Sequence, residues 1–326
     1  MSLAFHLARP LLHVMDAEDA HRLTIQALKC APRLGYGPIT SPALKRHVFG
    51  LEFPNPVGLA PGFDKNAEVP DAMLAQGFGF VEIGTVTPLP QMGNARPRLF
   101  RLSQDGAVIN RMGFNNEGHA AALQRLIARR ARGGIVGVNI GANKDSADRM
   151  DDYVKGIGVF EEVASYITIN ISSPNTPGLR NLQGKADLQR LLERANAARK
   201  SKTPMLLKIA PDLAADDLQD VASVCAGGAV DGVIISNTTL SRAGLHSPLA
   251  RESGGLSGRP LFELSTRCLA DFHHLSGGKI PLIGVGGIHD AASAQAKFKA
   301  GASLVQLYSA LVYKGPGLVR EICAGL

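Results

Sequence analysis

Eight short apolar runs between residues 56 and 307, most of them separated by segments with helical periodicity, constrain the possible folds of this chain most strongly. The runs are rich in Val, Ile and Leu, as strands buried on both faces of a parallel sheet are. They occupy residues 56–60, 80–85, 135–140, 166–171, 205–209, 232–236, 281–285 and 303–307. Eight such strands alternating with helices predict an α/β fold, the (β/α)8 TIM barrel. A doubly wound open sheet is less favoured, because no G-x-G-x-x-G motif follows the first run.

The segments between the runs predict helices at residues 67–76, 118–132, 160–164, 186–200, 216–226, 261–275 and 291–300. Two other segments are longer than the connections that a minimal barrel needs. Residues 96–114 hold two short alternating stretches around Asp105-Gly106, which predicts a β-hairpin. Residues 241–260 are long, Gly-rich and without helical periodicity, and we interpret them as a lid.

The first forty residues lie outside the predicted barrel, so we divide the chain into a small N-terminal helical extension, 1–40, and a barrel domain, 41–326. Residues 4–15 and 16–31 predict two short helices, with Asp16 as the N-cap of the second. The pair is either a helical hairpin covering the barrel's end or an interfacial membrane anchor. The first helix carries apolar side chains beside titratable ones: Phe5, Leu7, Leu11, Leu12, Val14 and Met15 with His6, Arg9 and His13.

Composition and charge exclude several classes of protein. Despite a net charge of +7, the basic residues are dispersed among acids, and no Lys/Arg stripe with aromatics predicts a nucleic-acid groove. The cysteines at 30, 225, 268 and 323 have no zinc or iron–sulfur spacing, so we expect reduced thiols in a cytosolic setting and no metal. No run reaches the ~18 apolar residues of a spanning helix. The N-terminus also lacks the pattern of a signal peptide.

Polar residues follow the fourth run, at residues 170–180. The carboxyl ends of parallel strands are where α/β proteins hold ligands. Asn170 and Asn175 offer donors and acceptors for a planar, amide-rich substrate, and Ser173 between them could move a proton. The alternative is a Pro- and Gly-rich surface loop that caps a helix.

Other strand ends indicate a charged ligand. The seventh run continues into residues 284–288, which are Gly-rich, and the eighth ends in residues 306–310, which are polar; in barrels these two loops often bind phosphate. A plain tight turn is the alternative. Lys208 interrupts the fifth run. Because burying an unpaired ammonium costs several kcal/mol, we expect it beside an electron-rich cofactor, although a surface lysine with a buried stem is the alternative.

Taken together, these motifs resemble the dihydroorotate dehydrogenase family. The matching segments, highly specific as a set, are residues 59–66, 110–115, 139–145, 170–180, 236–239, 254–258, 284–288 and 308–309. The resemblance extends from about residue 45 to the C-terminus. It favours the membrane-associated, quinone-reducing class, whose catalytic base is a serine, as at Ser173, whereas the soluble class carries cysteine there. Pro61 and Ser236 depart from the family pattern, in which a small residue and threonine are common.

The resemblance implies an FMN cofactor and the oxidation of dihydroorotate to orotate in pyrimidine synthesis, with ubiquinone or menaquinone as acceptor. It implies a peripheral protein on the cytoplasmic side of the cell inner membrane, with the N-terminal extension admitting quinone. Ser173 would take the proton from C5 while hydride leaves C6. The substrate residues would be Lys65, Asn110, Arg111, Met112, Gly113, Phe114, Asn170, Asn175, Asn237 and Thr238. The cofactor residues would be Pro61, Gly62, Phe63, Asp64, Lys65, Thr85, Asn139, Asn170, Lys208, Ser236, Gly258, Gly286, Gly287, Tyr308 and Ser309.

Three other interpretations remain open. Another FMN barrel oxidoreductase, such as a dihydrouridine synthase, would need a basic RNA surface, which the sequence lacks. A cofactor-free phosphosugar isomerase would share the phosphate loops. A non-catalytic barrel acting as a membrane scaffold would not need Ser173, Lys65 and Lys208.

Overall fold

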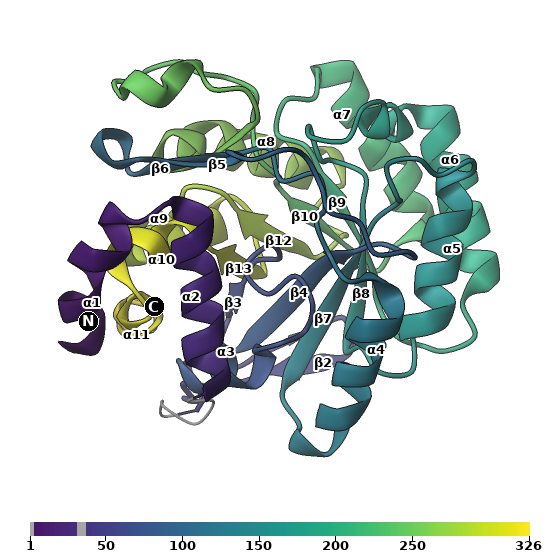
Figure 1. The fold of residues 1–326 in the computed structure, drawn as a ribbon. Helices are drawn as coiled ribbons and strands as arrows, with labels where there is room; N and C mark the ends of the chain where they lie inside the picture. The colour runs from purple at the N-terminus through teal and green to yellow at the C-terminus, as the bar shows by residue number, and fades with distance from the viewer. Residues whose placement is uncertain (1–2, 31–36) are drawn as a thin grey trace.

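The computed structural model describes residues 3–30 and 37–326 (Figure 1). Eight parallel strands close into a barrel in the order β3–β4–β7–β8–β9–β10–β12–β13. Each strand coincides with one of the apolar runs, so the predicted (β/α)8 barrel is confirmed. The strands are β3 Val57–Leu59, β4 Phe80–Val86, β7 Ile135–Ile140, β8 Tyr166–Asn170, β9 Met205–Ile209, β10 Gly232–Ile235, β12 Leu282–Val285 and β13 Leu304–Leu307.

Helices surround the barrel (Figure 1). They are α3 Pro70–Ala75, α4 Gly118–Arg129, α5 Arg149–Phe160, α6 Lys185–Ala198, α7 Ala215–Val224, α8 Phe262–Leu275 and α9 Ala291–Lys299, followed by α10 Ser309–Lys314 and α11 Gly317–Ala324. Short 3₁₀ or π turns lie at Ser103–Asp105, Arg130–Arg132, Leu179–Gln183, Cys225–Ala229, Pro248–Arg251 and Arg259–Leu261. The helix predicted at residues 160–164 is wrong, because α5 ends where it was expected to begin. The Asp148 carboxylate starts α5 by accepting the Met150 and Asp151 N–H groups, at 2.9 and 3.1 Å.

Large side chains fill the amino-terminal end of the barrel. Phe80 and Tyr166 are fully buried there, and a Cβ added at Gly58 or Gly137 would lie within 2.3 Å of their rings. The hairpin of β1 Arg46–Val48 and β2 Leu51–Phe53 closes this end, with the ring centroids of Phe53 and Phe80 5.1 Å apart. Each such ring contributes about 1.5–3 kcal/mol by leaving water. A ligand therefore enters at the carboxyl end.

A three-stranded antiparallel sheet stands beside the carboxyl end of the barrel. Its strands are β5 Leu99–Leu102, β6 Ala107–Asn110 and β11 Gly255–Gly258, in the order β11–β6–β5. The predicted hairpin around Asp105-Gly106 is confirmed, with Gly106 in the left-handed conformation at φ 56°. The segment interpreted as a lid, residues 241–260, contains β11, which pairs with β6 as the third strand of this sheet.

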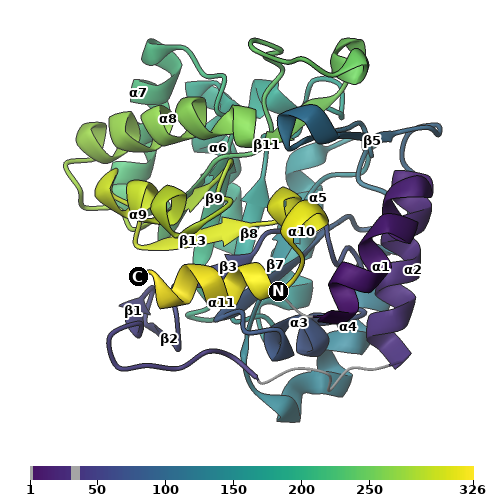
Figure 2. The ribbon, with the colours of Figure 1, turned by 90° about the vertical axis from the view of Figure 1, so that its left-hand side faces the viewer.

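The two predicted N-terminal helices are confirmed as α1 Leu3–Val14 and α2 Ala17–Cys30, which pack side by side (Figure 2). Asp16 caps α2, because its Oδ1 accepts the N–H groups of Glu18 and Asp19 at 2.9 and 3.1 Å. Toward α10, His13 Nε2 donates to Val312 O at 3.0 Å. Residues 31–36, just before the proposed boundary at 40, and the side chain of His6 lie outside the described residues. Within the described part, no helix has the length and hydropathy needed to cross a bilayer.

Candidate active site

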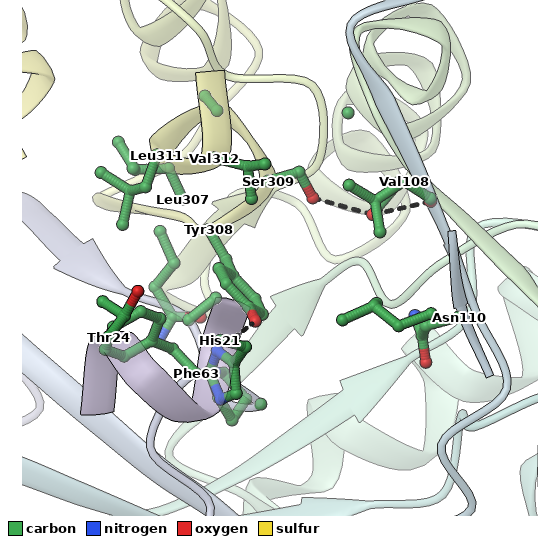
Figure 3. A pocket seen from close by; sticks show the side chains of 18 of the residues that line it. His21, Thr24, Phe63, Val108, Asn110, Leu307, Tyr308, Ser309, Leu311 and Val312 are labelled. Atoms are coloured by element: carbon green, nitrogen blue, oxygen red, sulfur yellow. Dashed lines mark hydrogen bonds between the residues drawn. The ribbon is translucent and has the colours of Figure 1, made fainter. Parts of the chain in front are cut away.

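A cavity of about 1660 Å³ opens at the carboxyl ends of the barrel strands and extends to the N-terminal helices. In Figure 3, His21 and Thr24 of α2 lie on one side of it, and Val108 and Asn110 of β6 lie opposite. Every residue predicted for catalysis, substrate or cofactor binding lines this cavity, except Asp64, Arg111 and Asn139. The structure therefore brings together side chains that were predicted separately from the ends of different strands.

Two of the three exceptions shape the surrounding loops. The buried Asp64 carboxylate accepts the backbone N–H of Val69 at 2.8 Å, and burial raises its pKa to about 6. It thus fixes the loop that leads from the cavity to α3. Arg111 pairs with Glu252 at 2.7 Å and lies over the Phe100 ring, 4.5 Å from its centroid. It links the strand β6 to the loop before β11.

Asn139, the third exception, lies in a buried network directly behind the cavity. Its Oδ1 accepts from Thr85 Oγ1 at 2.6 Å and from Asn170 Nδ2 at 3.0 Å, and both partners line the cavity. Its Nδ2 donates to Glu82 Oε1 at 2.7 Å. Glu82 also accepts from Tyr166 and from Gln306, at 3.0 and 2.6 Å. Sequence reasoning missed Glu82, although an acid within an apolar run is the same signal that identified Lys208.

Asparagines form one edge of the cavity. Asn170 Oδ1 accepts from Ser172 Oγ at 3.0 Å and from Asn237 Nδ2 at 3.3 Å. Asn175 Nδ2 donates to Asn110 Oδ1 at 3.3 Å. These hydrogen bonds hold the amide groups together along one polar edge of the cavity. Each amide still has a donor or an acceptor atom that a ligand can use.

Ser173 lies on this edge, lining the cavity while only 5% exposed. Its Oγ accepts the backbone N–H of Asn175 at 3.2 Å. Within the described residues, Oγ has no hydrogen bond to a carboxylate or an imidazole. Its own hydrogen is therefore available to a ligand or to water.

Two lysines bring positive charge to the cavity. Lys65 Nζ donates to the Gly62 carbonyl, and burial lowers the pKa of Lys65 to about 8. Burial also lowers the pKa of Lys208, with Glu82 partly opposing that effect. Neither ammonium forms an ion pair with a described acid, so both remain to be neutralised by an anionic ligand.

The turn after β12 has the shape of an anion-binding loop. Gly286 and Gly287 have φ of 108° and 77°, and an added Cβ would lie 2.7 Å from Ser265 Oγ or 2.4 Å from Phe262 Cα. Only glycine fits there, and it leaves the backbone close to the cavity. Opposite, Ser309 Oγ donates to Ser257 Oγ at 2.8 Å, so Ser257 belongs to the same site and was missed.

The part of the cavity next to the N-terminal helices is mainly apolar. The rings of His21, Phe63 and Tyr308 pack edge to face there, with centroids 5.3 Å and 5.6 Å apart on either side of Phe63 (Figure 3). Burial lowers the pKa of His21 to about 3, which keeps it neutral. Sequence reasoning did not name the α2 residues of this region. Their spacing along one helix face could have identified them: Ala17, Ala20, His21, Thr24, Ala27 and Leu28.

Comparisons with known proteins show which family the chain is similar to. A family model described as dihydroorotate dehydrogenase matches residues 43–326. The chain is 62% identical to a dihydroorotate dehydrogenase (quinone) of Parvibaculum lavamentivorans, over 99% of this chain and 93% of that protein. A relative of the same description from Mesorhizobium japonicum is 56% identical, over 100% of this chain and 92% of the relative. The structure of DHODH from Eimeria tenella in complex with ferulenol matches with a TM-score of 0.91 and 38% identity, over 97% of this chain and 93% of that one.

These matches decide between the interpretations that the sequence left open. The family model covers the whole barrel, and the match to the Parvibaculum lavamentivorans relative extends over 99% of the chain, N-terminal segment included. Neither a dihydrouridine synthase, an isomerase nor a scaffold is supported. The chain therefore belongs to the dihydroorotate dehydrogenase family, in its quinone-dependent class, and is an oxidoreductase.

Proposed function

We propose that this protein oxidises dihydroorotate to orotate in pyrimidine synthesis, with FMN as its flavin and a membrane quinone as electron acceptor. The family is flavin-dependent. For this chain, one structural observation supports the proposal most directly. Three kinds of group line a single cavity: a serine between asparagines, two unpaired lysines, and a glycine turn suited to phosphate. A phosphorylated flavin and an anionic, amide-rich substrate require all three.

The phosphate of FMN would lie at the glycine turn, where the backbone N–H groups are close to the cavity. Its proposed contacts are Gly258, Gly286, Gly287, Tyr308 and Ser309. The ring system would lie against Pro61, Gly62, Phe63, Thr85, Lys208 and Ser236. Bound FMN supplies a two-electron acceptor for the hydride from C6 of dihydroorotate. Lys208 would offset negative charge on the ring, while Asn139 would orient Thr85 and Asn170 from behind.

Dihydroorotate would lie between Ser173 and the flavin ring. Lys65 would pair with its carboxylate, and the amides of Asn110, Asn170, Asn175 and Asn237, with Thr238, would hold the pyrimidine ring. Met112, Gly113 and Phe114 would complete the pocket wall. Ser173 Oγ would accept the proton from C5 and pass its own hydrogen onward, as the available Oγ hydrogen allows.

Quinone would reach the flavin through the apolar part of the cavity between α1, α2 and α10. On α1, Leu7 is 75% exposed and Val14 is 88% exposed, a large apolar exposure for two side chains of one short helix. We propose that residues 1–40 form a peripheral anchor that inserts these side chains into the lipid surface, on the cytoplasmic side of the cell inner membrane.

Acid precipitation of the purified protein tests the cofactor. It should release one FMN for each chain, identified by chromatography against FMN, FAD and riboflavin standards. Release of FAD, or a folded protein without flavin, would refute this part of the proposal.

A further inference from the structure

Lys297 of α9 is a fully buried lysine outside the cavity lining. Its Nζ donates to Ser265 Oγ at 2.6 Å and lies 5.3 Å from the centroid of the Phe262 ring. Within the described residues, no carboxylate lies within ion-pairing distance. Burial lowers the pKa of Lys297 to about 7, and Cys268 and the exposed Glu263 oppose that effect only in part. An anion on the other side of the glycine turn would favour the charged form of this buried group.

The partner of Lys297 connects it to the glycine turn after β12. Ser265 Oγ contacts the Gly286 carbonyl at 3.0 Å as well as the Phe262 carbonyl at 3.2 Å, one turn back in its own helix. Because the ammonium can only donate, Ser265 accepts from Lys297 and donates its hydrogen to a carbonyl. The backbone also approaches closely, since a Cβ added at Gly284 would lie 3.2 Å from Lys297 Cβ.

This contact orients the peptide between Gly286 and Gly287. In a trans peptide the carbonyl and the N–H point in opposite directions. With the Gly286 oxygen held toward Ser265 inside the fold, the Gly287 N–H faces the opposite side, where both glycines line the cavity. The side chains proposed at the phosphate end, those of Tyr308 and Ser309, carry no positive charge.

We propose that Lys297 is a positioning residue that places positive charge behind the flavin phosphate and, through Ser265, holds the glycine turn in its phosphate-binding conformation. The site therefore selects a 5′-phosphorylated flavin over an unphosphorylated one. The inference rests on the proposed use of FMN. In this arrangement the phosphate dianion is the missing counter-charge of Lys297, and the two are separated only by the turn and one serine.

Lys297→Met tests this role, because Met retains the apolar stem without the charge. Protein stripped of flavin should be titrated with FMN and with riboflavin, following the quenching of flavin fluorescence. FMN affinity should fall about 10–150-fold, the range expected for losing a charge-assisted hydrogen bond of about 1.5–3 kcal/mol. Riboflavin affinity should stay within about twofold. Lys299→Met, which removes an exposed lysine from the same helix, is the matched control and should change neither affinity.

Ser265→Ala provides an independent variant if Lys297→Met does not fold. It should lower the ratio of FMN to riboflavin affinity at least about threefold, because a buried hydrogen bond contributes about 1 kcal/mol. If the ratio of FMN affinity to riboflavin affinity is the same in the variants as in the unsubstituted protein, the proposed role of Lys297 is overturned. If the unsubstituted protein itself fails to prefer FMN, the proposed cofactor fails instead, so the two failures are distinguishable.

Discussion

Glu18 of α2 and Arg98, 80 residues later in the chain, form a buried two-point ion pair, with Arg98 Nε 2.9 Å from Oε2 and Nη2 2.8 Å from Oε1. Arg98 stands just before β5, so the pair connects the N-terminal extension to the sheet that walls the cavity. Arg101 adds to this connection by donating to the carbonyls of Leu12 and Met15. The extension is therefore held to the barrel by polar bonds as well as by apolar packing.

Glu18→Ala should destabilise the protein by about 3–5 kcal/mol, because it leaves the Arg98 charge buried and unpaired. Chemical denaturation followed by circular dichroism measures this change. Glu117→Ala is the control, since it removes an exposed pair with Arg125 and should cost at most about 1 kcal/mol. An equal loss of unfolding free energy in both variants would show that the buried pair stabilises the protein no more than the exposed pair does.

The same pair predicts sensitivity to acid. The hydrogen bond from Arg98 is the main cause that lowers the pKa of Glu18 below its usual value of 4.5. A lowered folded-state pKa means that this stabilisation is complete above pH 4.5 and is lost as the pH falls through the folded value. The unfolding free energies of the unsubstituted protein and of Glu18→Gln should be measured between pH 3 and 6. The difference between the two proteins should shrink as the pH falls. A difference that stays constant over this range would contradict this linkage.

Ser173→Ala should retain flavin and orotate binding but slow flavin reduction by dihydroorotate about 10²–10⁴-fold, the usual loss for a general base. Ser173→Cys should recover part of the rate, because a thiolate can accept the same proton. Anaerobic stopped-flow absorbance gives these rates. An unchanged rate in the alanine variant would reject Ser173 as the base.

Lys65→Ala should weaken orotate binding at least about 30-fold, because removing one partner of a buried charge pair costs about 2–5 kcal/mol. With the pKa of Lys65 near 8, orotate affinity of the unsubstituted protein should fall as the pH rises above 8. Lys65→Arg should abolish that dependence. Titrations of the flavin spectrum between pH 6 and 9 measure both effects, and equal affinity in the alanine variant would refute the role.

Leu7→Glu combined with Val14→Glu should abolish binding to anionic vesicles, because each carboxylate prevents insertion of an exposed α1 position into lipid. Reduction of a small soluble dye should stay unchanged, while reduction of a long-chain quinone in vesicles should fall. Ile127→Glu changes an exposed apolar residue of α4 and serves as the control. If all three proteins bind vesicles equally, α1 is a structural cover and not an anchor.

The sequence predicted the barrel well because apolar strand runs and polar strand ends are local signals. Helix α5 was missed almost entirely, since two aspartates and two glycines interrupt its apolar spacing between Arg149 and Phe160. Lys297 was missed for a different reason. Two lysines end α9, where cations are ordinary, and nothing local distinguishes the buried Lys297 from the exposed Lys299. Burial of that kind is decided by the packing of α9 against α8, which the sequence does not reveal.

Anaerobic titration of the purified protein with dihydroorotate, followed by addition of ubiquinone or menaquinone, tests the central claim most directly. We expect the visible flavin absorbance to bleach fully with one equivalent of dihydroorotate per flavin, with release of orotate. Quinone should then restore the absorbance. A flavin that stays oxidised in excess dihydroorotate, or one that bleaches but is not reoxidised by either quinone, would contradict the proposed reaction.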